Sequence, residues 1–206
     1  MSVDANLSQP CLKPRWHSVA ALTLLVLCCS WLSSCSTIIS ASRDEPISEN
    51  YGKRTTGAII DDQLIETKAS VNLRKTDERF QKAQVDIDAH NGVVLLTGNV
   101  PQADMRDIAT LTVQKIRKVR RVHNELEVSP PQSFGAKLGD SWLGTKINTR
   151  LLFNNEISSQ RVHVVVENGV VFLMGLATRA EADRIVEATK KTYGVQKIVR
   201  VFEYID

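Results

Sequence analysis

A ten-residue pattern occurs twice in this chain, and it limits the possible folds more than any other feature. The segments are AHNGVVLLTG at residues 89–98 and VENGVVFLMG at residues 166–175. Each has alternating apolar residues before an Asn-Gly pair and further apolar residues after it. Asn-Gly pairs tolerate the positive φ angles of a tight hairpin turn. Each segment therefore predicts the centre of a β-hairpin.

The similarity between the two copies extends beyond the hairpins. A helical pattern and then a strand follow each hairpin, and another short helical stretch precedes it, near residues 61–73 and 140–153. The repeated unit is therefore α-β-β-α-β. A solenoid needs at least three repeats to bury its faces, so two copies instead indicate two tandem α+β domains. We expect each domain to be a small mixed sheet packed by two helices.

The domain boundaries follow from this repeat. The first domain is expected at residues 59–128 and the second at residues 140–206. Between them, residues 129–139 are expected to form a linker, because Pro130-Pro131 ends the preceding strand and two glycines follow.

The N-terminal region indicates export and attachment to a membrane. A short positive segment precedes an apolar run, residues 19–32, which ends in Leu32-Ser33-Ser34-Cys35. Small residues before a cysteine at the end of such a run resemble a bacterial lipobox. That resemblance implies cleavage before Cys35 and acylation of this residue. An ordinary signal peptide or a membrane anchor is the alternative.

Residues 1–34 are accordingly expected to be a lipoprotein signal peptide and residues 35–58 a flexible tether rich in Ser, Thr, Arg, Glu and Gly. Serine at position 36, where inner-membrane lipoproteins commonly carry aspartate, suggests the outer membrane, with the domains facing the periplasm. All four cysteines lie at or before position 35, so the mature chain has no cysteine pair for a disulfide or metal site.

The sequence contains little that predicts chemistry. His90, His123 and His163 lack the spacing of a zinc-binding helix, and no nucleophile elbow, P-loop or dinucleotide fingerprint is present. Asp86 and Asp88 lie two apart and are better explained as the polar face of an amphipathic strand than as a catalytic pair. We expect no enzyme activity, no cofactor and no metal.

A dense basic run covers residues 115–121. It is explained either as the solvated end of a helix, where cations interact favourably with the helix dipole, or as a patch for an anionic lipid. Removing residues 1–34 lowers the formal charge only from +3 to +2. An exported chain with so balanced a charge is not expected to bind nucleic acid.

The two copies differ on one face of their sheets. Charged or polar residues of the first copy are replaced by valines in the second. The pairs are Asp88 and Val165, His123 and Val199, and Glu125 and Val201. These positions alternate with the core positions of their strands, so they lie on the opposite sheet face. An apolar second face must be covered, either by the other domain or linker or by a partner protein.

The helix that begins the second copy carries two stripes. Leu143, Ile147 and Leu151 share one face at ~100° per residue and are expected to pack on the sheet. A neighbouring face carries Trp142, Lys146, Thr149 and Phe153, whereas the first copy has Leu64 and Lys68 at the places of Trp142 and Lys146. Tryptophan beside lysine is typical of a membrane–water interface. Burial of Trp142 between the domains is the alternative.

These features together resemble the BON-domain family, in particular the dual-BON outer-membrane lipoproteins of Gram-negative bacteria. The matching segments are NGVVLLTG at 91–98, ENGVVFLMG at 167–175, and DSWLGTKI at 140–147, which fits the D-x-W-x-x-T-K pattern of the family. The lipobox, the duplicated unit and the tryptophan are each unspecific, but their combination is specific for this family.

The resemblance implies a non-enzymatic lipoprotein that binds anionic phospholipid through its second BON domain and supports outer-membrane integrity. Carried over by position, the lipid-binding residues are Leu138, Trp142, Leu143 and Lys146. A periplasmic adaptor or chaperone that binds outer-membrane or other envelope proteins is the alternative function.

Overall fold

The computed structural model describes residues 54–206. The expected signal peptide, the acylated Cys35 and all but the last residues of the expected tether lie outside the described residues. The tether was expected to extend to residue 58, but the first helix already begins at Thr56. The two repeats form two α+β domains in tandem, as the duplication predicted.

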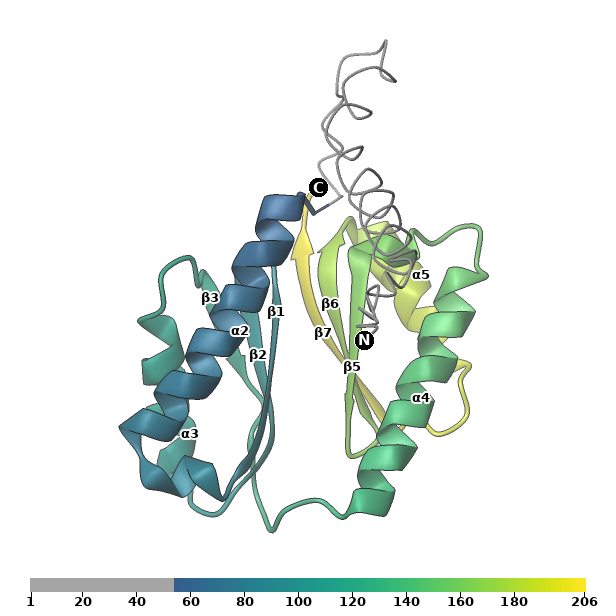
Figure 1. The fold of residues 1–206 in the computed structure, drawn as a ribbon. Helices are drawn as coiled ribbons and strands as arrows, with labels where there is room; N and C mark the ends of the chain where they lie inside the picture. Colours follow the sequence, from purple (N-terminus) through teal and green to yellow (C-terminus); the bar gives the residue numbers. More distant parts are fainter. Residues whose placement is uncertain (1–53) are drawn as a thin grey trace, which may run out of the picture. The chain divides into compact units, whose positions relative to one another are not determined.

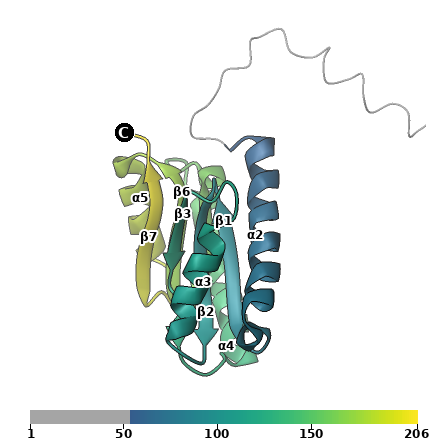
Figure 2. The ribbon, with the colours of Figure 1, turned by 90° about the vertical axis from the view of Figure 1, so that its left-hand side faces the viewer.

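The first domain consists of a mixed sheet with helices on one side (Figure 1). Its elements are α2 (Thr56–Thr76), the 3₁₀ turn η1 (Glu78–Gln81), β1 (Gln84–His90), β2 (Val93–Val100), α3 (Asp104–Gln114), β3 (Arg121–Asn124) and β4 (Glu127–Val128). Strand β2 lies in the centre, antiparallel to β1 and parallel to β3 and β4. Figure 2 shows the first domain from the side that is on the left in Figure 1, with α2 and α3 labelled. Both helices contribute to one buried core with the inward residues of the sheet.

The second domain repeats this arrangement around its own core. Its elements are α4 (Phe134–Leu152), the 3₁₀ turn η2 (Ser159–Arg161), β5 (Val162–Glu167), β6 (Val170–Ala177), α5 (Arg179–Lys190) and β7 (Lys197–Tyr204). Strand β6 is central, antiparallel to β5 and parallel to β7. A capping box at Thr178 and Glu181 begins α5. The fold class expected from the sequence is confirmed.

The connection between the domains is shorter than expected. Helix α4 begins at Phe134, inside the range assigned to a linker, because the Ser133 hydroxyl caps it by accepting the Ala136 N–H at 3.3 Å. Gly135 and Gly139, which were expected to loosen the chain, lie within the helix. Only residues 129–133 therefore connect β4 to α4 without regular structure.

Both hairpin turns have the conformation that their Asn-Gly pairs predicted. The φ angles are +53° at Asn91 and +76° at Gly92, and +50° at Asn168 and +73° at Gly169. Two consecutive positive φ angles in each hairpin correspond to the type I′ turn that joins twisted strands.

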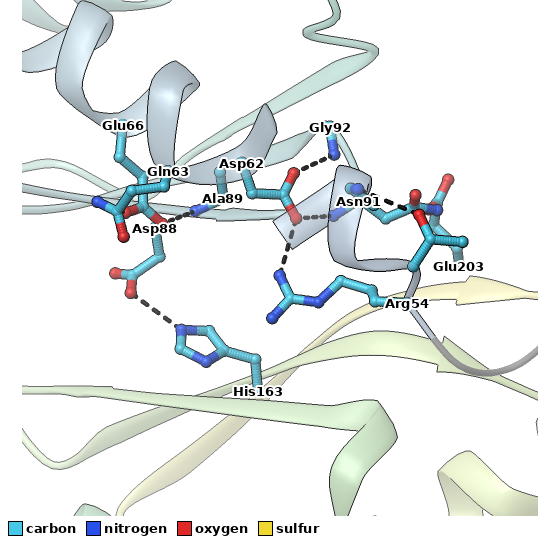
Figure 3. Close-up of polar contacts among 12 residues, drawn as sticks. Arg54, Asp62, Gln63, Glu66, Asp88, Ala89, Asn91, Gly92, His163 and Glu203 are labelled. Carbon is cyan, nitrogen blue, oxygen red and sulfur yellow. Dashed lines mark hydrogen bonds and ion pairs between the residues drawn. The ribbon is translucent and has the colours of Figure 1, made fainter. Parts of the chain in front are cut away.

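An aspartate from the first helix of each domain fixes its hairpin turn. In the first domain the Asp62 carboxylate accepts the N–H groups of Asn91 and Gly92 at 2.7 and 2.8 Å, and it also pairs with Arg54 at 2.8 Å (Figure 3). In the second domain Asp140 accepts the corresponding two N–H groups at 2.8 and 2.9 Å. The helix and the hairpin are thus joined by the same charge-assisted hydrogen bonds in both copies.

The two sheets pack against each other through a third apolar cluster. Val93 and Leu95 from β2 contact Phe172 and Met174 from β6, and Val201 from β7 completes the cluster. The remaining valines of the second domain pack at its margin, namely Val165, Val170 and Val199. The valine-rich face of the second domain is therefore covered by the first domain, one of the two expected outcomes.

Polar contacts surround this cluster. The Asp88 carboxylate of β1 contacts His163 Nε2 of β5 at 3.0 Å (Figure 3). The His163 ring also stacks on His90, with 6.2 Å between the ring centroids. Burial lowers the pKa of His90 to about 4, so this ring is neutral at physiological pH. Glu203 of β7 accepts hydrogen bonds from Asn91 and Arg120. These residues join the two domains.

Candidate functional site

Helix α4 is held to its sheet by one face only. Leu143, Ile147 and Leu151 are buried in the core of the second domain, as their spacing predicted. The helix continues beyond this contact toward its N-terminus, where its first turns carry no buried side chain. The opposite face is consequently free to present side chains to solvent.

That free face carries five large exposed apolar side chains. Trp142 is 64% exposed, and the other large apolar side chains that share its face are also exposed: Phe134, Leu138, Leu152 and Phe153. We call these five residues the α4 stripe. Burial of Trp142 between the domains, the alternative considered from the sequence, is therefore wrong. A row of exposed aromatic and aliphatic side chains on one helix marks an interaction surface.

Leu143 does not belong to this surface. Its side chain is only 6% exposed and packs in the domain core. The family resemblance placed Leu143 among the lipid-binding residues by position, but consecutive helical residues such as Trp142 and Leu143 lie ~100° apart. Leu143 supports the helix from beneath, while Leu138, Trp142 and Lys146 remain on the outside.

Cations accompany the α4 stripe. The ammonium of Lys146 lies 6.0 Å from the centre of the Trp142 ring, within the range of a cation–π contact. One turn further along, Arg150 donates a hydrogen bond from Nη1 to the Thr192 hydroxyl at 3.2 Å. Thr192 lies in the turn between α5 and β7. This turn and α4 together line a groove of about 650 Å³.

A second cavity, between the domains, has the opposite charge. It measures about 400 Å³ and is lined by Asp86, Asp88, Asp140 and Glu167, with Lys137 as a cation. Burial raises the pKa of Glu167 to about 7, and the nearby Asp86 carboxylate adds to this effect. A cavity so rich in carboxylates repels anions. Between residues 54 and 206, no three acidic, histidine or cysteine side chains are grouped as metal ligands.

The family profile of the BON domain matches residues 61–130 and again residues 139–206. The chain belongs to the BON-domain family. The resemblance inferred from the two hairpin motifs is thereby confirmed, and both BON domains correspond to the two repeats of the fold.

Two relatives, each matched by this chain over more than two thirds of its own length, support this assignment. The chain is 37% identical over 153 residues to the outer membrane lipoprotein DolP of Haemophilus influenzae, covering 74% of this chain and 79% of that protein. It is 32% identical over 152 residues to the 21 kDa hemolysin of Actinobacillus pleuropneumoniae, covering 74% and 78%.

A more distant relative is the osmotically-inducible protein Y of Escherichia coli, 26% identical over 145 residues and covering 69% of this chain and 72% of that protein. Among solved structures, the C-terminal domain of CdsD from the Chlamydia trachomatis type III secretion system covers 70% of this chain and 67% of its own length, at 14% identity and a TM-score of 0.28. That score is too low to support an argument.

Sequence reasoning missed several residues of the second BON domain's exposed surface. Phe134 and Leu152 extend the α4 stripe, and their spacing from Leu138 and Trp142 was a signal that could have found them. Tyr193 and Lys191 also line the groove, yet they lie in the α5–β7 turn. Only the tertiary fold brings that turn beside α4, so no local pattern predicted it.

None of the helices between residues 54 and 206 has both the length and the hydropathy needed to cross a bilayer.

Proposed function

We propose that the chain is an outer-membrane lipoprotein, acylated at Cys35 and facing the periplasm, that binds anionic phospholipid and supports outer-membrane integrity. The observation that carries the proposal is the α4 stripe with Lys146 and Arg150 beside it. The name of the Haemophilus relative, an outer membrane lipoprotein, supports the location. Leu138, Trp142 and Lys146 are the proposed contact residues from the sequence, joined now by Phe134 and Phe153.

The energetics favour a weak interaction that the anchor makes effective. Insertion of one large aromatic side chain contributes ~1–3 kcal/mol, and each cation near an anionic surface adds ~1 kcal/mol. An acyl chain on Cys35 would hold the domains near the membrane and raise the effective concentration of α4 there. Under these conditions, a few side chains on α4 are sufficient for membrane binding.

The decisive test is Trp142→Glu in the mature chain without its acyl group, residues 36–206. This variant should lose binding to phosphatidylglycerol-containing vesicles in a co-sedimentation measurement, because a carboxylate replaces the interfacial ring beside Lys146. Its thermal unfolding should stay close to that of the wild type, since Trp142 is 64% exposed.

The matched control is Leu64→Glu. Leu64 follows Asp62 by two residues, as Trp142 follows Asp140, and it is exposed on α2. This change should leave vesicle binding nearly intact. Normal binding by folded Trp142→Glu protein would refute the proposal, and so would equal loss in both variants.

The anchor is tested separately by Cys35→Ala in the full chain. Without the acylated thiol the protein should appear in the soluble periplasmic fraction or remain uncleaved, and palmitate labelling should disappear. Cell fractionation with metabolic labelling measures both. Persistent labelling of the alanine variant would show that another residue carries the lipid.

The alternative function, an adaptor that binds envelope proteins through the valine-rich sheet face, loses its main observation. In the structure that face packs on Val93 and Leu95 of the first domain. Nothing else in residues 54–206 favours a protein partner over a lipid surface.

A further inference from the structure

The two hairpin turns carry a dipeptide that reacts with itself. In an Asn-Gly pair the glycine nitrogen can attack the Cγ atom of the asparagine carboxamide, because glycine has no side chain in the way. A cyclic succinimide forms and ammonia leaves, and water then opens the ring at either carbonyl to give aspartate or isoaspartate. The net reaction is hydrolysis of one amide, and water is its only reagent. The chain has such a pair in each hairpin, Asn91-Gly92 and Asn168-Gly169.

Both glycine nitrogens are held by a carboxylate. The Gly92 N–H donates to Asp62 at 2.8 Å, and the Gly169 N–H donates to Asp140 at 2.9 Å. The nitrogen attacks after it has lost this proton, and a neighbouring carboxylate disfavours the loss because it would place a second anion beside the first. The nitrogen must also turn toward its own asparagine, which breaks the hydrogen bond. Each aspartate therefore slows the reaction in its own hairpin.

The two asparagines are not protected equally. The Asn91 carboxamide donates a hydrogen bond from Nδ2 to Glu203 at 3.3 Å, and the hydrogen bond of the glycine that follows it is buried. The Asn168 carboxamide, in contrast, makes no hydrogen bond to any residue between 54 and 206. The hydrogen bond of the glycine that follows Asn168 is only partly buried. Asn168 is thus the asparagine whose side chain is free to turn toward the attacking nitrogen.

We propose that Asn168 is a site of spontaneous deamidation, that Asp140 sets its rate, and that Asn91 is protected. The product has a carboxylate at position 168, next to Glu167 and against the Asp140 carboxylate, which accepts the N–H of this same residue at 2.8 Å. Like charges so close repel each other. Isoaspartate also adds a methylene to the backbone of a turn whose length fixes the register of β5 and β6.

The modification reaches beyond the turn because of where Asp140 lies. Asp140 belongs to α4, and its two hydrogen bonds join this helix to the hairpin. Repulsion between Asp140 and a carboxylate at position 168 weakens that attachment. Deamidation therefore loosens α4 on its own sheet as the protein ages, whether or not a lipid is present.

The test is storage of the mature chain, without its acyl group, in mildly alkaline buffer for several weeks. Trypsin places the two asparagines on separate peptides, residues 83–106 and 162–179. Mass spectrometry should find the mass increase of amide hydrolysis at Asn168 first, with Asn91 largely intact. Asp140→Ala should speed conversion of Asn168 about tenfold, because opening of the turn then breaks two fewer hydrogen bonds. The same variant should leave the rate at Asn91 unchanged, and circular dichroism checks that it is folded.

Asn168→Gly is the control, because glycine has no carboxamide to react and keeps the positive φ of the turn. Stored wild-type protein should unfold at a lower temperature than fresh protein, whereas Asn168→Gly should not change on storage. This comparison tests the site even where Asp140→Ala does not fold. Equal conversion of Asn91 and Asn168 in the wild type would overturn the proposal. So would an unchanged rate in folded Asp140→Ala, or a slower rate, which would show that the carboxylate acts as a base.

Discussion

Gly175→Ala should strongly destabilise the second BON domain. Gly175 has a φ of +143°, which side chains rarely adopt, and a Cβ there would overlap the carbonyl oxygen of Arg161, the residue just before strand β5. Neither backbone can move without breaking the pairing of β5 with β6. Backbone strain and overlap together should lower the free energy of unfolding by ~3–5 kcal/mol. Urea denaturation followed by circular dichroism measures this loss.

Gly139→Ala is the control for this substitution. Gly139 lies in α4 with no atom near the position of its missing Cβ. Alanine there should raise the free energy of unfolding by up to ~1 kcal/mol, because it removes the entropic cost of a helical glycine. If Gly175→Ala lost less than ~1 kcal/mol, the close approach of β5 to β6 would be wrong.

Asp62→Ala should have the next largest effect. The Asp62 side chain is buried at 3% exposure and accepts two backbone N–H groups of the hairpin turn while neutralising Arg54. Its removal leaves one buried donor, the Gly92 N–H, and one partly buried donor, the Asn91 N–H, without partners, at ~1–3 kcal/mol each. We expect a loss of ~3 kcal/mol in unfolding free energy, together with faster hydrogen exchange at Asn91 and Gly92.

Asp140→Ala provides the comparison within the same chain. Asp140 makes the same two bonds in the second domain but is only partly buried. Both hydrogen bonds of Asp140 are only partly buried, and within residues 54–206 it has no arginine partner like Arg54, so the loss should be smaller. Equal and small losses in both variants would mean that the aspartates do not hold the hairpins.

The hairpins and the cores were predictable because their signals are local. Alternating apolar residues and an Asn-Gly pair specify strand, turn and buried face within ten residues, and Val164 and Leu173 lie where that pattern places them. Ile147 lies where the helical spacing of α4 places it. The aspartates were not predicted, although Asp62 precedes Asn91 by 29 residues and Asp140 precedes Asn168 by 28. That near-constant interval is a signal that a comparison of the copies could have used.

Three other features could not be predicted from local patterns: the break between β3 and β4, the start of α4, and the groove beside α4. Val122, Leu126 and Val128 alternate like one strand, yet the strand is interrupted between β3 and β4, where the Asn124 side chain accepts the Leu126 N–H at 3.1 Å. The start of α4 was placed too late because two glycines suggested a loop, whereas the Ser133 cap begins the helix before them. The groove required the positions of α4 and a turn about 40 residues later in the chain, which only the packed domain supplies.

The apolar cluster between the sheets makes each copy depend on the other. Without the first copy, the second would expose Phe172, Met174 and Val201 to water. The first copy covers these side chains with Val93 and Leu95. Deletion of either copy would therefore leave the other with exposed apolar surface, whereas substitutions on the outer face of α4 leave this contact intact.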